Sequence, residues 1–265
     1  MDGKIAVVTG ANTGIGRVTA RELARAGALV YLANRSVERS ADAMREIASV
    51  GGRAEVLPLD LSSLKSVEKF ARTLSGSVPR VDLLVANAGL AGVRELSADG
   101  YELTFAINHL GHFALTQHLL PKLAGGRVVV VASNAHYRAK GIDFDALSRP
   151  ATWRGMFPAY SVSKLANVLF ARELSRRYPD ILACSLHPGV IKSDIWRRIP
   201  QPVRWLFTRA MISVEQGALT SLHCAGADDI EPGLYYDKSA VKAPSAAALD
   251  DALAKALWEK SEAWT

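Results

Sequence analysis

Residues 4–16 read KIAVVTGANTGIG, and this stretch decides the fold. An apolar run rich in β-branched residues leads directly into a turn with three glycines, after which a helical pattern begins. Glycines at such a turn let the backbone bend tightly and approach a pyrophosphate, and the helix N-terminus offers amides and a positive dipole end to that anion. With a strand before and a helix after, the turn predicts a dinucleotide site that includes Gly10, Asn12, Thr13, Gly14, Ile15 and Gly16.

The rest of the chain repeats this alternation of apolar runs and helical patterns. The apolar runs are rich in Val, Leu and Ile without polar alternation, which is typical of strands covered on both faces. Expected strands are residues 4–9, 28–33, 54–59, 81–86, 127–131 and 181–186, and expected helices are residues 14–27, 36–50, 62–74, 100–124 and 159–178. Because strands separated by helices form right-handed crossovers, we expect one α/β domain over residues 1–265 with a doubly wound parallel sheet.

The composition is that of a globular protein, with 49% hydrophobic and 22% charged residues. A net charge of +6 arises from 32 basic and 26 acidic residues. No run of five like charges appears, so a solvated basic surface is favoured over a nucleic-acid site. No stretch approaches the roughly 18 apolar residues that span a bilayer, and the start MDGK leads straight into the first strand. With Cys184 and Cys224 both in apolar stretches, we expect a cytoplasmic protein with reduced thiols.

The second expected strand ends in Ala-Asn34-Arg35-Ser. An acidic residue there would bind the ribose hydroxyls of NAD(H) and repel a 2′-phosphate, but this chain has a neutral and a cationic residue. Arg17, in the first turn of the helix after the glycines, adds a second positive charge. Each arginine alone is more simply a surface charge. Together, and without the acid, they favour NADP(H), because a guanidinium binds phosphate through two parallel hydrogen bonds.

Four polar residues carry the chemistry. Tyr160 and Lys164 share one face of a helix, and a fixed cation is expected to lower the pKa of a phenol from about 10 toward the working range. Ser133 follows the fifth expected strand, where its hydroxyl can hold a substrate oxygen. Asn108 is a polar residue among apolar neighbours. These residues predict hydride transfer at a carbinol carbon, with Tyr160 as general acid and base.

The spacing Gly-x-x-x-Gly-x-Gly and the order Asn108, Ser133, Tyr160 and Lys164 resemble the short-chain dehydrogenase/reductase superfamily, whose fold is a Rossmann sheet. The resemblance implies that Lys164 binds the nicotinamide ribose and that Asn108 supports a proton relay. It implies that Asp60 bonds adenine, and that Ser193 replaces a threonine that holds the nicotinamide amide or a phosphate. Further implied cofactor contacts are Leu61, Asn87, Ala88, Gly89, Pro188, Gly189 and Ile191.

The long segment between Ser133 and Tyr160, together with LHPGVIKSDI and SVEQGALTSLHCA, resembles the retinol dehydrogenase-like branch. That branch implies a lipophilic aldehyde or ketone as substrate. Residues 193–213, with paired aromatic residues beside arginines, form a candidate substrate lid; a helix packed on the core and a membrane-contacting segment are the alternatives. Many relatives pair through the two long helices, and the added segment could obstruct that surface, so both a homodimer and a monomer remain open.

The sequence favours this function over a metal site, a dinucleotide sensor and nucleic-acid binding. His109, His112 and His118 lie on one expected helix, but no carboxylate or cysteine accompanies them in a metal-binding pattern, so we expect no metal site. A non-catalytic NADP(H) sensor would need the glycine turn but would have no use for the serine, tyrosine and lysine together. Nucleic-acid binding would depend on charge alone, since the sequence contains no known motif for nucleic-acid recognition. The expected partner is a small carbonyl or alcohol substrate.

Overall fold

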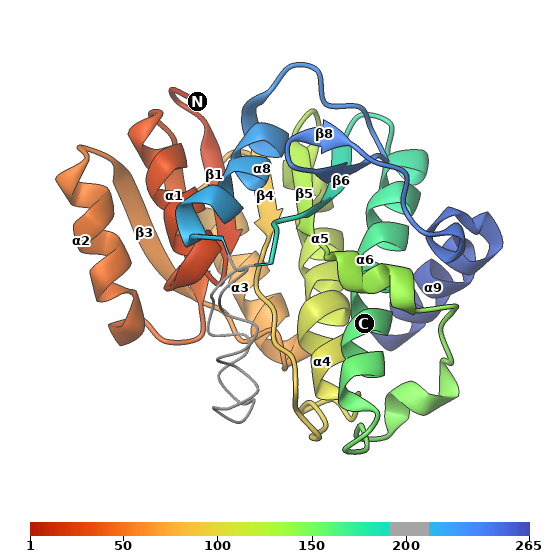
Figure 1. The fold of residues 1–265 in the computed structure, drawn as a ribbon. Coiled ribbons are helices and arrows are strands. Elements are labelled where there is room, and N and C mark those ends of the chain that lie inside the picture. Colours follow the sequence, from red (N-terminus) through yellow and green to blue (C-terminus); the bar gives the residue numbers. More distant parts are fainter. Residues whose placement is uncertain (191–211) are drawn as a thin grey trace.

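The computed structural model describes residues 1–190 and 212–265. In these residues one sheet of eight strands has the order β3-β2-β1-β4-β5-β6-β7-β8, so chain order reverses between β1 and β4 (Figure 1). The strands are β1 (Ile5–Thr9), β2 (Leu29–Asn34), β3 (Arg53–Pro58), β4 (Leu83–Ala86), β5 (Arg127–Val131), β6 (Leu182–His187), β7 (Tyr235–Asp237) and β8 (Ala240–Val241). Neighbouring strands are parallel except β7 and β8, which confirms the doubly wound sheet.

Helices cover both faces of this sheet. One face packs against α1 (Gly14–Arg25), α2 (Ala41–Ser49) and α8 (Val214–Gly226). The other packs against α3 (Leu64–Ser77), α5 (Gly111–Leu123) and α6 (Met156–Arg177), and α9 (Asp251–Trp264) packs on α6. Within the described ranges, no helix is both long enough and apolar enough to cross a bilayer.

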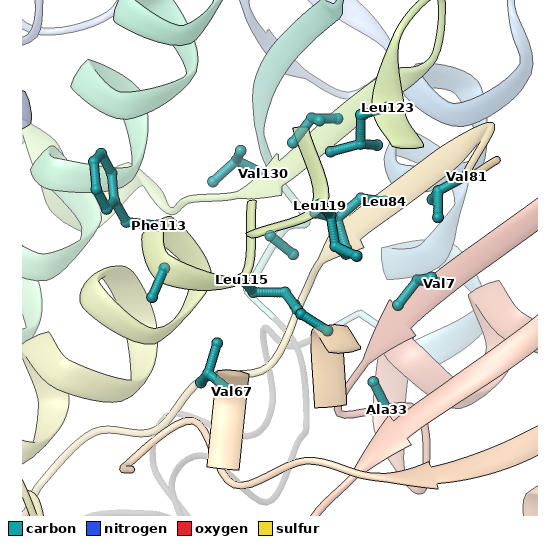
Figure 2. Packing of buried hydrophobic residues seen from close by; sticks show 14 of the residues in the cluster. Val7, Ala33, Val67, Val81, Leu84, Phe113, Leu115, Leu119, Leu123 and Val130 are labelled. Carbon is teal, nitrogen blue, oxygen red and sulfur yellow. The ribbon is translucent and has the colours of Figure 1, made fainter. Parts of the chain in front are cut away.

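Consecutive residues of the central strands point to opposite faces, and both faces are buried. Val7 belongs to the cluster under α3, α5 and α6, whereas Val8 belongs to the cluster under α1, α2 and α8. Figure 2 shows Val7, Leu84 and Val130 from three neighbouring strands in one cluster with Phe113 of α5. Burial on both faces explains why these strands lack polar alternation in the sequence.

The helix expected over residues 100–124 is interrupted. It consists of α4 (Leu103–Phe105), a π-helical turn η2 (Ala106–Leu110) and α5. The buried carboxylate of Glu102 caps its start by accepting the N–H of Phe105 at 2.8 Å. Asn108 lies in the π-helical turn, which widens the helix locally at a predicted catalytic residue.

Three other helices begin at different residues than expected. The helices expected from residues 36 and 62 begin at Ala41 and Leu64. The second of these is capped by Ser63, whose hydroxyl accepts the N–H of Ser66 at 3.4 Å. The side chain of Ser62 bonds Asp60. The helix α6 begins at Met156 rather than at residue 159, so Tyr160 lies in its second turn.

The segment after β6 adds elements that the sequence analysis did not predict. Ser213 and Gln216 form a reciprocal capping box at the start of α8. The chain then returns to the sheet as β7, parallel to β6, and turns back as the short antiparallel strand β8. The last helix, α9, places Trp258 against Phe113 of α5 and Phe170 of α6.

Candidate active site

A cleft of about 600 Å³ lies at the carboxyl ends of the strands. Most of the expected cofactor and catalytic residues line it: Gly10, Asn12, Thr13, Gly14, Ile15, Gly16, Asn34, Arg35, Asp60, Leu61, Asn87, Ala88, Gly89, Ser133, Tyr160, Lys164, Pro188 and Gly189. Asn108 and Arg17 are not among the lining residues. Ile191, Ser193 and the candidate lid up to residue 211 lie outside the described residues.

The glycine turn can accept only glycine at two positions. Gly10 has a φ of +65°, and a Cβ there would lie 2.9 Å from the Cα of Ala88. A Cβ on Gly16 would collide with the amide of Asn87 and lie 2.5 Å from the carbonyl oxygen of Gly10. The first turn of α1 contains no acidic residue, and the side chain of Thr13 does not cap it. The turn therefore fits the pyrophosphate of a dinucleotide, which would meet backbone amides and a positive helix end.

Thr9, at the end of β1, fixes the turn after β4 against the glycine turn. Its hydroxyl accepts the backbone N–H of Asn87 and of Ala88, each at 2.9 Å. The side-chain amide of Asn87 donates to the carbonyl oxygen of Thr9 at 2.8 Å. The two turns that border the cleft at the centre of the sheet are thus one hydrogen-bonded unit.

The expected catalytic side chains meet on the β5 side of β4, away from the glycine turn that follows β1. Tyr160 and Lys164 lie on α6, and Ser133 follows β5. The hydroxyls of Ser133 and Tyr160 share a hydrogen bond, and the ammonium of Lys164 lies 5.8 Å from the centre of the Tyr160 ring. The Lys164 ammonium donates to the carbonyl oxygen of Val131 at 2.8 Å.

The expected lowering of the tyrosine pKa by the lysine is wrong for the chain alone. Burial raises the pKa of Tyr160 to about 12, although the hydrogen bond from Ser133 acts in the opposite direction. Burial also lowers the pKa of Lys164 to about 7. Both groups are buried, and the cost of removing a charge from water is the largest influence on each pKa.

Asn108 lies beneath the cleft and is fully buried. Its side-chain oxygen accepts the N–H of Leu90 at 2.9 Å, and its amide donates to the carbonyl oxygen of Leu90 at 3.1 Å and to the Ser163 hydroxyl at 2.9 Å. A Cβ on Gly89 would lie 3.3 Å from the Asn108 oxygen and 3.6 Å from the Lys164 ammonium. The Asn108 side chain therefore holds the loop after β4 against α6, next to the lysine.

The opposite end of the cleft, beside β2 and β3, contains two arginines. Arg35 lines the cleft as expected, and so does Arg39, which the sequence analysis missed. A short 3-10 helix, η1 (Glu38–Ser40), turns the chain so that Arg39 reaches the same cleft. The buried side chain of Asn34 holds this turn by donating to the Ser40 hydroxyl at 2.9 Å. The sequence signal that could have identified Arg39 is its position four residues after Arg35.

Two charged residues expected at the cofactor have partners within the chain. Arg17 pairs with Glu46 of α2, with 3.5 Å between Nε and Oε2, and it does not line the cleft. Asp60 lines the cleft as expected, and its Oδ1 accepts the N–H of Ser62 at 2.9 Å and the hydroxyl of Ser62 at 2.6 Å. These two hydrogen bonds close a turn after β3.

The histidines near the site are buried and neutral. Burial lowers the pKa of His109 to about 3 and that of His112 to about 4. His109 pairs with the hydroxyl of Ser261 at 3.0 Å, and His112 pairs with that of Thr9 at 2.8 Å. In residues 1–190 and 212–265, no group of three or more histidine, cysteine or acidic side chains is arranged to hold a metal ion. His187, which the sequence analysis did not single out, lines the cleft.

Comparison with known proteins agrees with this geometry. The family model for short chain dehydrogenases matches residues 4–144. The chain is 44% identical to human dehydrogenase/reductase SDR family member 13, covering 98% of this chain and 72% of that protein. It is 40% identical to human retinol dehydrogenase 11, covering 98% and 85%. A crystal structure of an uncharacterized protein from Mycobacterium paratuberculosis superposes with a TM-score of 0.81 and 36% identity, covering 99% and 93%. The chain therefore belongs to the short-chain dehydrogenase family and is an oxidoreductase of its retinol dehydrogenase-like branch.

Proposed function

We propose that this protein interconverts an alcohol and a carbonyl compound with NADP(H), and that Tyr160 is the general acid and base. The observation that carries the proposal is the hydrogen bond between the Ser133 and Tyr160 hydroxyls, with Lys164 beside them in the cleft that the glycine turn borders. A sensor that only bound the dinucleotide would have no use for this cluster. When bound, the nicotinamide cofactor supplies or accepts the hydride.

The residues of the cluster have separate roles in the proposed reaction. Ser133 donates a hydrogen bond to the carbonyl oxygen and stabilises the negative charge that develops on it. Tyr160 gives its hydroxyl proton to that oxygen in reduction and takes it back in oxidation. Because burial raises the pKa of Tyr160 to about 12, the phenol of the chain alone is protonated, which is the state that carbonyl reduction requires. Lys164 would hold the nicotinamide ribose, and Asn108 supports the lysine from beneath.

The arginines beside β2 support NADP(H) over NAD(H). The strand ends in Asn34, which leaves no carboxylate at that position to repel a phosphate. Arg35 and Arg39 both line this end of the cleft. Two guanidinium groups bind the 2′-phosphate that distinguishes NADP(H) from NAD(H), and the exposed position of Arg35 allows it to close on the phosphate.

The rim of the cleft supports a lipophilic substrate. Leu96 and Val190 line the cleft and are 40% and 54% exposed. Phe157, one turn before Tyr160 on α6, and Trp153 are further exposed apolar side chains, but they do not line the cleft. Apolar side chains left open at the mouth of a reactive site favour a bulky apolar carbonyl compound.

We also propose that the protein is monomeric and cytoplasmic. Trp258 of α9 packs on Phe113 of α5 and Phe170 of α6, the two helices through which many family members pair. The last helix of the chain therefore occupies part of the surface of these two helices. Cys184 and Cys224 are buried thiols close enough to share a hydrogen bond, which fits a reducing compartment.

The test is a screen of NADPH consumption against hydrophobic aldehydes, ketones and quinones, with NADH in parallel. We expect turnover with at least one lipophilic carbonyl compound and a preference for NADPH. Tight NADPH binding with no turnover across the panel would favour the sensor instead. A preference for NADH would remove the assignment of Arg35 and Arg39.

A further inference from the structure

The residue after the proposed catalytic serine is held by three partners from the last parallel strands. The backbone N–H of Asn134 donates to Nδ1 of His187 at 3.3 Å, at the end of β6. Its side-chain oxygen accepts the hydroxyl of Tyr235 of β7 at 2.8 Å. Its side-chain amide donates to the carboxylate of Asp237, also of β7. Three polar groups of Asn134 are thus tied to strands that the chain reaches only later.

The orientation of the Ser133 hydroxyl depends on the turn that contains Asn134. Ser133 caps the short helix η3 (Asn134–Arg138), and its hydroxyl accepts the N–H of Ala135 at 3.2 Å. Its carbonyl oxygen accepts Nδ1–H of His136 at 2.7 Å. One lone pair of the Ser133 hydroxyl accepts from Ala135. The hydroxyl therefore has its proton and second lone pair left for Tyr160. A rotation of the turn at residues 134–136 would move the hydroxyl away from Tyr160.

Tyr235 is placed and protonated to hold that turn. It is 1% exposed, and burial raises its pKa, so its hydroxyl remains a donor to Asn134. Its ring packs edge-on against the ring of His136, with 4.9 Å between their centres. Asp237, the other partner on this strand, is itself held by Lys242 at 2.7 Å. Neither Tyr235 nor Asp237 takes part in the reaction proposed above.

We propose that Tyr235 is a positioning residue, which acts through Asn134 to hold the hydroxyl of Ser133 toward Tyr160. The inference rests on the proposed function, because it assumes that the Ser133 hydroxyl binds the carbonyl oxygen. It makes the strand β7, which lies beyond the part of the chain matched by the family model, a component of the active site.

The neighbouring residue provides a matched control for a purely structural role. Tyr236 is also a buried tyrosine of β7, at 2% exposure, and its hydroxyl accepts the N–H of Glu231 at 2.8 Å. Consecutive strand residues face opposite sides of the sheet, so Tyr236 packs in the cluster under α1 and α8. Tyr236→Phe removes one buried hydroxyl, as Tyr235→Phe does, but on the side away from Asn134.

The experiment compares Tyr235→Phe, Tyr236→Phe, Ser133→Ala and the double variant Tyr235→Phe/Ser133→Ala. For each, kcat and KM are measured with the best carbonyl substrate of the screen under single-turnover and steady-state conditions. NADPH affinity and melting temperature are measured in parallel. We expect Tyr235→Phe to lower kcat about tenfold, the effect of one hydrogen bond, with unchanged NADPH affinity. Tyr236→Phe should leave kcat unchanged at a similar loss of melting temperature.

The double variant separates positioning from general weakening. If Tyr235 acts only by orienting Ser133, Tyr235→Phe has no further effect on kcat once the serine hydroxyl is gone. The inference is overturned if Tyr235→Phe and Tyr236→Phe have equal kcat, or if the tenfold loss persists in the Ser133→Ala background. Wild-type turnover in Ser133→Ala alone would be a different failure, because it would remove the proposed role of the serine and the inference with it.

Discussion

The imidazole of His112 lies with Nε2 2.8 Å from the hydroxyl of Thr9, and this contact belongs to a chain of hydrogen bonds beneath the cleft. The carbonyl oxygen of Asn108, 3.1 Å from Nδ1, can only accept, so Nδ1 of the neutral ring carries the proton. Nε2 is then an acceptor for the Thr9 hydroxyl, which itself accepts the backbone N–H of Asn87 and Ala88. His112 thus joins the turn after β4 to the π-helical turn beside Lys164.

His112→Phe should therefore weaken NADPH binding as well as the fold. A phenyl ring fills the space but removes the donor to the Asn108 carbonyl oxygen, and it leaves the Thr9 hydroxyl only the carbonyl oxygen of Val85, at 3.4 Å, as an acceptor. Each buried group left unpaired costs about 1–3 kcal/mol in the free energy of unfolding. Because the Asn87 and Ala88 turn borders the cofactor cleft, we expect about a tenfold rise in the NADPH dissociation constant, measured by fluorescence titration.

His109→Phe is the matched control for that measurement. His109 is also a buried histidine of the same helical segment, but its Nε2 pairs with Ser261 of α9, away from the cleft. His109→Phe should have a lower free energy of unfolding in urea denaturation and an unchanged NADPH affinity. Equal NADPH affinities of the two variants would contradict the link between His112 and the turn of Asn87 and Ala88 that borders the cleft.

Tyr160→Phe should bind NADPH almost normally and lose turnover by about 10²- to 10⁴-fold, the usual contribution of a general acid. The variant keeps the ring, which is 8% exposed, and removes the hydroxyl that bonds Ser133. Tyr101→Phe, at a partly buried tyrosine outside the cleft lining, controls for the loss of a phenol. Turnover of Tyr160→Phe within a few-fold of the wild type would exclude Tyr160 as the proton donor.

Lys164→Met should abolish turnover and stabilise the cofactor-free protein near neutral pH. The side chain is 3% exposed, and burial lowers its pKa to about 7 from 10.5. The charged form is thus less favourable in the fold than in the unfolded chain by about 1.4 kcal/mol for each unit of that difference. Below about pH 7 both states are protonated and the whole penalty is present. Between pH 7 and 10.5 the unfolded chain binds a proton that the fold does not, so stability rises with pH.

The stabilisation by Lys164→Met should therefore shrink between about pH 6.5 and pH 9.5, as measured by urea denaturation of both proteins. Lys122→Met is a suitable control. The Lys122 ammonium also donates to a backbone carbonyl oxygen, that of Val78 at 3.1 Å, but the residue is only partly buried. If Lys164→Met raised the free energy of unfolding equally at both pH values, side-chain entropy or packing, rather than a buried charge, would explain the increase.

What the sequence could predict was local. Six strands were predicted because each is a short apolar run between glycines, prolines or helix starts, and the glycine turn carries its own geometry. The sequence did not predict β7, because this strand is only three residues long and ends in Asp237. Its place in the sheet is set by pairing with β6 rather than by its own pattern. The π-helical turn at Asn108 arises from contacts with Leu90 and Ser163, which no periodicity records.

The candidate site divides in the same way. Ser133, Tyr160 and Lys164 could be found because each follows a predicted strand or shares a helix face. The mutual effect of Tyr160 and Lys164 on their pKa values could not, because it depends on how deeply the fold buries both groups. The support of Ser133 by Tyr235 depends on a hydrogen bond between Tyr235 and Asn134, which are 101 positions apart. The two residues meet only because β7 pairs with β6 in the folded sheet.

Arg39→Ala should raise the dissociation constant of NADPH about tenfold and leave that of NADH unchanged. Arg39 and Arg35 line the end of the cleft beside β2, and only NADPH carries a 2′-phosphate on its adenosine ribose. A hydrogen bond to a charged group contributes about 1.5–3 kcal/mol, and solvent screening at this open end places the expected effect at the lower limit. Arg17→Ala is the control, because Arg17 pairs with Glu46 and does not line the cleft. A selective loss of NADPH affinity in Arg17→Ala, with none in Arg39→Ala, would show that the phosphate lies against α1 and would reverse the assignment.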